Sequence, residues 1–160
     1  MRISIFAIGR MKQGPERELV ERYLDRCGKS GKSLGFSRFD VREWDESRAA
    51  RAEERKAEEA RHILTALTPG AVLVALDERG RSPSSPDFAE RLGAWRDAGR
   101  PEAVYAIGGP DGHGDDIRAR ADLVLSFGAM TWPHQLVRLM LAEQIYRATT
   151  ILSGHPYHRV

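Results

Sequence analysis

The sequence has little of what marks secreted and membrane proteins. Its 160 residues include a single cysteine, Cys27, so no internal disulfide can form, and this fits a reducing cytoplasm. No apolar run approaches the roughly 20 residues that a membrane-spanning helix needs. The opening stretch 1–8 is too short, and lacks the small-residue cleavage site, for a signal peptide. We therefore expect a cytoplasmic protein that does not contact a membrane.

The sequence also lacks a strong excess of one charge. Its 25 Lys and Arg residues against 23 Asp and Glu residues give a net charge of +2, far below that of proteins that coat nucleic acids. Any RNA binding must therefore come from a local patch. From Pro133 onward the segment is basic, with three arginines and three histidines against the single acidic residue Glu143. An ordinary solvated surface is the alternative interpretation of this segment.

Apolar runs alternate with amphipathic stretches along the whole chain. The runs predict strands at 3–8, 38–44, 71–76, 103–107 and 123–127. Helices are predicted at 16–27, 47–67, 85–95, 115–121 and 134–152, with loops at 28–35 and 77–84. Apolar strands separated by helices are typical of an α/β fold with a mainly parallel sheet and helices on both faces. With 41% hydrophobic residues, no repeat and no linker, residues 1–160 are expected to form one domain.

The last predicted helix, 134–152, is apolar on nearly all sides. Such a helix must be covered on more than one side. If the sheet covers only one of them, a second copy of the chain is needed for another, which predicts a homodimer. A core helix in a monomer is the alternative.

The glycine motifs of common nucleotide-binding proteins are missing. Only Gly9 follows the first strand, where dinucleotide-binding folds carry G-x-G-x-x-G. The stretch 28–33 lacks the preceding strand and the earlier glycine of a P-loop, and no G-x-S-x-G elbow exists for a hydrolase. These absences exclude the commonest nucleotide and hydrolase sites.

Three strand ends nevertheless form a candidate ligand site, because open α/β sheets bind ligands at the carboxyl ends of their strands. These ends are 76–77, 107–112 and 127–133. The pair Gly108-Gly109 lets a ligand approach the main chain, and the third loop combines free backbone groups with apolar side chains. This combination suits a flat base with its ribose better than a triphosphate. An ordinary loop is the alternative for the glycine turn.

The tail 154–160 has an unusual composition for a chain end. It holds two imidazoles, a phenol and a guanidinium, groups that can move protons, stack on a base and hold phosphate. A frayed tail of chance composition is the alternative. The spacing of His155 and His158 resembles a metal motif, but no carboxylate or cysteine accompanies it, so no metal is expected. Cys27 lies on an apolar helix stripe, which predicts a packed core thiol.

Four parts of the sequence together resemble one known family. They are Leu76 at the end of its strand, Ile107-Gly-Gly-Pro-Asp-Gly112, the stretch Leu125–Arg138 with its Pro-His-Gln segment, and the tail His155-Pro-Tyr-His-Arg159. These parts are similar to the bacterial large-subunit (23S) ribosomal RNA pseudouridine-N3 methyltransferases of the SPOUT class. The likeness covers essentially the whole chain. Two residues depart from the family pattern. His113 stands where an apolar residue is usual, and Trp132 stands where leucine or phenylalanine is usual.

The resemblance implies a C-terminal trefoil knot, a rare exception to unknotted topology. It also implies S-adenosyl-L-methionine as the cofactor and a homodimer in which the tail of one subunit completes the site of the other. The substrate would be a pseudouridine of 23S rRNA on the assembled 70S ribosome. The cofactor residues carried over by position are Leu76, Gly108, Phe127, Gly128, Ala129, Met130, Thr131 and Trp132.

The roles of the polar residues are hypotheses based on chemistry. His158 is the candidate for proton handling, with His134 as second choice, and Tyr157 is the candidate for stacking or hydrogen bonding. The substrate-binding candidates are Arg159, His155 and Arg138, the last of which could instead bridge the dimer. Two other functions remain open: a ribosome-binding protein without turnover, and a SPOUT methyltransferase acting on another RNA such as tRNA.

Overall fold

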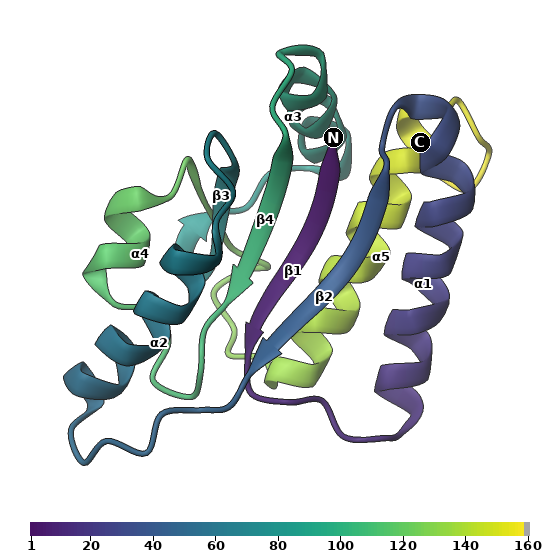
Figure 1. Cartoon of the computed structure of the whole chain (residues 1–160). Coiled ribbons are helices and arrows are strands. Elements are labelled where there is room, and N and C mark those ends of the chain that lie inside the picture. The colour runs from purple at the N-terminus through teal and green to yellow at the C-terminus, as the bar shows by residue number, and fades with distance from the viewer. Residues whose placement is uncertain (159–160) are drawn as a thin grey trace.

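The computed structural model describes residues 1–158, which form a five-stranded sheet flanked by helices (Figure 1). All strand pairs are parallel, and the strand order is β2-β1-β4-β3-β5. The strands are β1 (Arg2–Ile8), β2 (Arg38–Trp44), β3 (Val72–Arg81), β4 (Glu102–Ile107) and β5 (Leu123–Leu125). The helices are α1 (Pro15–Gly31), α2 (Ala52–Ala66), α3 (Ser85–Asp97), α4 (Asp115–Arg120) and α5 (His134–Leu152), with a 3₁₀ turn at Lys32–Leu34. The predicted α/β class with a parallel sheet is confirmed.

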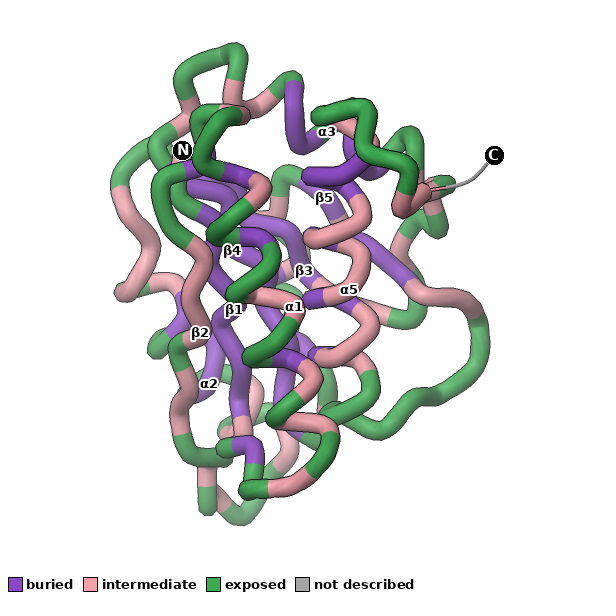
Figure 2. The backbone as a smooth tube through the Cα atoms, turned by 90° about the vertical axis from the view of Figure 1, so that its right-hand side faces the viewer, coloured by how far each residue is buried: buried purple, intermediate pink, exposed green. Residues whose placement is uncertain are grey.

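The sheet is buried on both faces, which explains why its strands are apolar without alternation. Ile3 and Ile5 of β1 pack with α1, α3 and α5, whereas Phe6 and Ile8 pack with α2 and α4 on the opposite face. Figure 2 shows β1, β3 and β4 as the buried centre of the molecule. Cys27 of α1 is fully buried in the first of these cores, as predicted, and burial raises the pKa of its thiol.

Two predicted helix boundaries are wrong, and each depends on a side-chain contact that the local pattern does not reveal. Helix α1 continues through the expected loop as far as Gly31, because the missing Cβ there leaves room for the Phe39 ring, which a Cβ would meet at 2.7 Å. Helix α2 begins at Ala52 and not near residue 47. The carbonyls of Ala49 and Ala50 accept hydrogen bonds from the Arg55 side chain at 3.0 and 3.1 Å, and 47–51 follow a non-helical path.

Strand β3 is longer than predicted and runs through the expected loop to Arg81. Its far end crosses β5 closely, since a Cβ at Gly80 would meet the main chain of Val124 and Leu125 at 2.6–2.7 Å. After the crossing, the backbone N–H of Ser126 donates to the Arg81 carbonyl at 2.8 Å. The extension therefore ties the chain that leaves β5 back to β3.

Helix α5 occupies residues 134–152 as predicted, but the argument that only the sheet could cover it is wrong. It packs against α1 and α3 as well as the sheet, and its residues Leu141, Ala142 and Ile145 are fully buried (Figure 1). Neighbouring helices of the same chain thus account for most of its apolar sides. None of the helices within residues 1–158 is long and apolar enough to span a bilayer.

The packing of α3 generates a stability prediction. Leu92 is fully buried between α3 and the sheet, whereas its neighbour Arg91 is exposed. We expect Leu92→Ala to lower the free energy of unfolding by about 2–5 kcal/mol, through lost burial and the cavity left behind. Arg91→Ala is the matched control and should change it by less than about 0.5 kcal/mol. Urea unfolding followed by circular dichroism measures both, and equal effects would contradict the core placement.

Candidate functional site

A pocket of about 380 Å³ lies at the carboxyl edge of the sheet, where the three predicted strand ends meet. Its walls are the end of β3, the glycine turn after β4 and the loop between β5 and α5, with single residues added by α2 and α4. The lining residues used below are Leu76, Asp77, Gly108, Gly109, Asp111, His113, Phe127, Gly128, Met130, Thr131, Trp132, His134, Lys56, Arg79 and Arg118. A volume of this size is typical of small-molecule sites.

The structure brings together the residues expected to bind a cofactor, with one exception. Leu76, Gly108 and the loop residues Phe127, Gly128 and Met130–Trp132 all line the pocket. Ala129 is not among the lining residues and is exposed. Met130 is the most exposed large apolar side chain of the described residues, at 72%. The loop therefore offers uncovered apolar surface at the rim of the pocket.

The glycine turn 108–112 presents main chain to the pocket at Gly108 and Gly109, where there is no space for a Cβ. The Gly112 N–H donates to the Gly109 carbonyl at 2.9 Å, which closes the turn. A Cβ at Gly108 would meet the Gly112 carbonyl carbon at 2.9 Å, and Gly112 itself has a φ of +74°. Only glycine adopts both arrangements without strain. This turn is thus a preformed wall of backbone groups.

The loop after β5 is held by one side chain. The Ser126 hydroxyl accepts a hydrogen bond from the Gly128 N–H at 3.1 Å and lies 2.9 Å from the Gly128 carbonyl, to which it donates. Ser126 itself is buried. Because Ser126 uses its side chain inside the loop, the apolar residues that follow carry the surface that a ligand would touch.

Sequence reasoning missed the charged groups that α2, β3 and α4 add to the pocket. Arg118 forms an ion pair with Asp77 at 3.0 Å and also donates to the His113 carbonyl. Burial acts to raise the pKa of Asp77, but hydrogen bonds from the Arg79 main chain and the Arg118 side chain outweigh it and lower that pKa. The pocket thus contains a carboxylate that stays charged. Lys56 and Arg118 come from helices whose pattern gave no sign of a ligand site.

His113, the departure from the family pattern, is buried between the pocket and β4. Its Nε2–H donates a hydrogen bond to the Ala106 carbonyl at 3.0 Å. Burial lowers the pKa of the imidazole and outweighs the hydrogen bond and the charge of Asp77, which raise it. A neutral His113 therefore fills the space behind the glycine turn.

The tail folds back on its own helix α5. The Tyr157 hydroxyl donates to Glu143 at 3.0 Å, and its ring packs edge-to-face on Tyr146 with centroids 4.8 Å apart. Arg147 lies over the Tyr157 ring, at 4.9 Å, and approaches Nδ1 of His158 at 3.4 Å. The tail is therefore packed rather than frayed as far as residue 158.

Other predicted tail residues have simpler surroundings. His155 is exposed and accepts a hydrogen bond from the Tyr157 N–H at 3.1 Å. Arg159 lies outside the described residues. Burial, together with hydrogen bonds to Tyr23 and Glu143, raises the pKa of Tyr157, so its phenol stays protonated.

The tail and the pocket of one chain are separated along α5. His134 lines the pocket, whereas Glu143, the partner of Tyr157, lies nine residues further along the helix. At 1.5 Å per residue this corresponds to about 14 Å along the helix axis, and to about 9 Å from Val137, the other pocket residue of α5. Neither Tyr157 nor His158 lines the pocket. A single copy of the chain therefore does not bring the candidate catalytic tail to its own pocket.

Arg138 does not fit its predicted substrate contact. Its side chain is buried, is paired with Glu43 of β2 and donates to the Gly9 carbonyl at 2.9 Å. These contacts join α5 to the ends of β1 and β2. Because a guanidinium enclosed in this way has no face left for a phosphate, we correct its role to an internal tie.

A second, larger hollow of about 550 Å³ lies between α1, α3 and α5, on the other side of the segment Leu125–Gly128. Its walls are mainly apolar. Among the residues lining it are Leu19, Tyr23, Phe88, Leu139, Met140 and Glu143. It thus begins beside the carboxylate that holds the tail. Within residues 1–158, no group of three His, Cys, Asp or Glu side chains is placed to hold a metal ion.

Comparison with known proteins gives one consistent result. The family described as "Predicted SPOUT methyltransferase" matches residues 1–158. A protein of Brucella anthropi is 59% identical over 159 residues, which cover 99% of each chain, and one of Mesorhizobium japonicum is 57% identical with the same coverage. A protein of Rhizobium etli is 56% identical over the full length of both chains. All three are named ribosomal RNA large subunit methyltransferase H.

The burial of His113 generates a pH prediction. Its pKa in the folded protein lies below the ordinary value of 6.5, so the unfolded chain binds a proton first as the pH falls. The neutral histidine therefore contributes stability above pH 6.5 that is lost as the pH drops below that value. When the pH is lowered from about 7.5 to about 5.5, we expect the free energy of unfolding to fall less for His113→Gln than for the wild type.

Urea unfolding at both pH values measures this difference, in which contributions common to the two proteins cancel. His62→Gln, which removes an exposed imidazole on α2, is the control and should follow the wild type. If His113→Gln also follows the wild type, the buried neutral histidine is not responsible for the pH dependence.

Proposed function

The chain belongs to the SPOUT methyltransferase family, and on this premise we propose that it transfers a methyl group from S-adenosyl-L-methionine to 23S ribosomal RNA. The observation that carries the proposal is the pocket at the carboxyl edge of the sheet, together with identity above 55% to three large-subunit rRNA methyltransferases over 99% or more of the chain. The finer part of the proposal is that the acceptor is N3 of a pseudouridine on the assembled 70S ribosome. That part rests on the resemblance of the sequence motifs.

The pocket fits S-adenosylmethionine by its chemistry. Its volume of about 380 Å³ is within the range of sites for ligands of this size. Leu76, Phe127 and Met130 supply apolar surface for the base, and the glycine turn supplies main-chain donors and acceptors without side chains in the way. Asp77 lies in the same pocket as an ionised carboxylate whose charge is balanced by Arg118. When bound, the cofactor supplies a methyl group on a positively charged sulfur.

The chain's own residues would orient the acceptor and handle its proton. N3 of pseudouridine is a weak acid, and it must lose its proton before or during attack on the methyl group. We propose His158 for this role, Tyr157 for stacking or hydrogen bonding to the base, and His155 and Arg159 for contacts with the RNA. His134 is the alternative base, since it already lines the pocket and is exposed.

A homodimer would join the two halves of the site. Glu143, which holds Tyr157, lies about 9 to 14 Å along α5 from the pocket residues Val137 and His134, and a second subunit would remove this separation by placing its tail at the pocket. The hollow between α1, α3 and α5 lies beside Glu143, which holds the tail, and it is the surface against which we propose that a second subunit packs. We also propose, from membership of the family, that the C-terminal part of the chain forms a trefoil knot.

Labelled methyl transfer tests the function. Purified protein and labelled S-adenosylmethionine are incubated with 70S ribosomes, separated subunits and tRNA, all from a strain that lacks this gene. We expect label in 3-methylpseudouridine of 23S rRNA, and only with assembled ribosomes. Label in tRNA would overturn the substrate. No label, from protein that binds the cofactor, would favour a ribosome-binding protein without turnover.

Subunit complementation tests the divided site. A pocket variant, Gly108→Val, and a tail variant, His158→Ala, should each be inactive, because each damages one half of the proposed site. When the two are unfolded together and refolded, mixed dimers hold one intact composite site, so we expect about a quarter of the wild-type activity to return. Each variant refolded alone is the control. No recovery from folded mixed dimers, or a monomer by sedimentation, would contradict the shared site.

The same variant tests the role of His158. Under saturating substrate we expect His158→Ala to slow single-turnover methyl transfer by about a hundredfold or more at neutral pH, in line with general base catalysis. His62→Ala, which changes an exposed imidazole on α2 outside the pocket, is the matched control. A normal rate for His158→Ala would remove the proton-handling role and direct attention to His134.

A further inference from the structure

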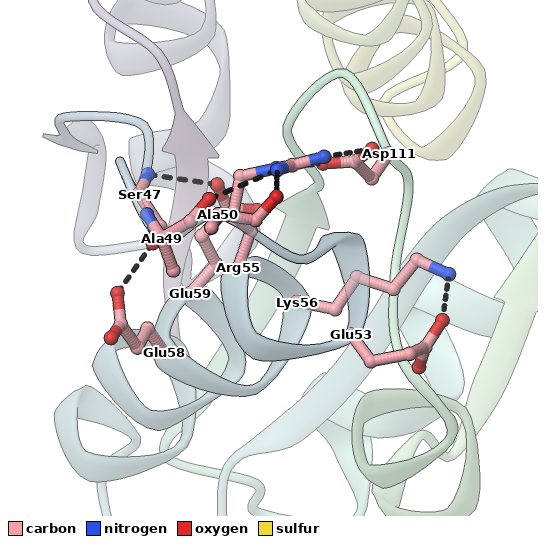
Figure 3. Close-up of polar contacts among 9 residues, drawn as sticks. All are labelled: Ser47, Ala49, Ala50, Glu53, Arg55, Lys56, Glu58, Glu59 and Asp111. Atoms are coloured by element: carbon pink, nitrogen blue, oxygen red, sulfur yellow. Dashed lines mark hydrogen bonds and ion pairs between the residues drawn. The ribbon is translucent and has the colours of Figure 1, made fainter.

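The glycine turn of the pocket is held from outside by helix α2 (Figure 3). Arg55 binds both oxygens of Asp111, with Nε to Oδ2 at 2.7 Å and Nη2 to Oδ1 at 3.0 Å. Its remaining nitrogen, Nη1, donates to the carbonyls of Ala49 and Ala50 at 3.0 and 3.1 Å. One side chain therefore connects the turn at Asp111 to the segment that leads into α2. Bidentate pairs of this kind fix geometry as well as charge.

The neighbouring residue of α2, Glu59, lies directly behind the turn. A Cβ at Gly109 would come within 2.8 Å of its Oε2, so the carboxylate and the main chain of Gly109 are in contact. Glu59 is buried, and its Oε1 accepts a hydrogen bond from the Ser47 N–H at 3.0 Å. Its other oxygen, Oε2, lies against the Gly109 main chain, whose N–H acts to lower the pKa of Glu59. The turn thus packs directly against a buried carboxylate.

The positive charge of Arg55 offsets the repulsion between the carboxylates of Asp111 and Glu59. Asp111 is held by Arg55, and the hydrogen bond between them lowers the pKa of Asp111. Burial raises the pKa of Glu59, and the charge of Asp111 raises it further, which means that the two carboxylates repel one another. The positive charge of Arg55 interacts with both. Without the guanidinium, Asp111 would lose its partner and would be pushed away from Glu59, and the turn would be free to shift.

We propose that Arg55 is a positioning residue for the cofactor site, which acts through Asp111 to hold the turn 108–112 in its binding shape. The proposal rests on the proposed function, because it assigns the turn to S-adenosylmethionine. Arg55 does not line the pocket, whereas Gly108, Gly109 and Asp111 do. Its effect is therefore transmitted by the turn. A turn that is displaced before binding must be reordered by the ligand, which weakens binding.

A purely structural role for Arg55 is less consistent with the packing. Helix α2 is already docked by its buried apolar residues, among them Ala60 and Ile63, which pack on the opposite face of the sheet from α5. Arg55 is not part of that core, and its side chain is 28% exposed. Loss of Arg55 should consequently change the shape of the turn more than the stability of the fold.

Calorimetric titration with S-adenosylmethionine and with its demethylated product, S-adenosylhomocysteine, tests the proposal. We expect Arg55→Ala to weaken binding of both by about tenfold to a hundredfold. Arg55→Lys retains the charge without the bidentate geometry and should recover part of the affinity. Arg51→Ala is the matched control, because the Arg51 side chain is exposed just before the same helix and forms its one ion pair within residues 1–158 with Glu54, at 3.9 Å. It should bind like the wild type.

Two further readouts separate positioning from loss of folding. In steady-state methyl transfer, Arg55→Ala should raise KM for the cofactor with little change in kcat, whereas partial unfolding would lower kcat and leave KM unchanged. In a double-mutant cycle, Asp111→Asn should add no further loss to Arg55→Ala, because both remove the same contact. Thermal unfolding of each variant checks that it is folded at the assay temperature.

The outcomes distinguish this inference from the proposed function. Wild-type protein that binds neither ligand would contradict the proposed function itself. Wild-type binding that is unchanged in folded Arg55→Ala would overturn only the positioning role. Additive losses in the cycle would also overturn it, since Arg55 would then act by a route other than Asp111. A raised KM for the cofactor, together with non-additive losses in the double-mutant cycle, supports the positioning role of Arg55.

Discussion

The parallel pairing of β1, β4 and β3 is the constraint on which the rest of the structure depends. These strands are buried on both faces, and their registers align Ala7 with Ile107 and Leu76 with Ile107 at the same edge. Since parallel strands all end in one direction, the loops that follow them meet there and form the pocket. Helices on both faces keep this edge as the open part of the sheet.

The site that results is made largely of main chain. The glycine turn, closed by its own hydrogen bond, and the loop fixed by Ser126 present backbone groups and apolar side chains, while Asp77 is the carboxylate fixed within it. Such a wall binds a ligand well only if its shape is maintained before binding. The contacts of α2 with the turn provide that support at a distance from the ligand. This division between binding surface and supporting helix explains why charged residues of α2 lie so close to the pocket.

The same architecture divides the chemistry. Helix α5 begins at the pocket and carries the chain away from it, so the aromatic and basic tail packs against Glu143 and Tyr146. An enzyme of this small size has few elements left with which to build a second wall around its substrate. A second copy of the chain, as we propose, would supply those elements without lengthening the sequence.

The sequence by itself determined the strands, the limits of α5, the core thiol Cys27 and the three loops of the pocket, because apolar periodicity and glycine placement are local signals. It did not determine the starts and ends that depend on distant contacts, such as α1 reaching Gly31 beside Phe39 or β3 continuing past Gly80. Only the tertiary structure decided that Arg138 is an internal tie and that Arg118 belongs to the pocket. An arginine looks the same in sequence whether it faces solvent or a buried carboxylate, and its role is set by the partner that folding places beside it.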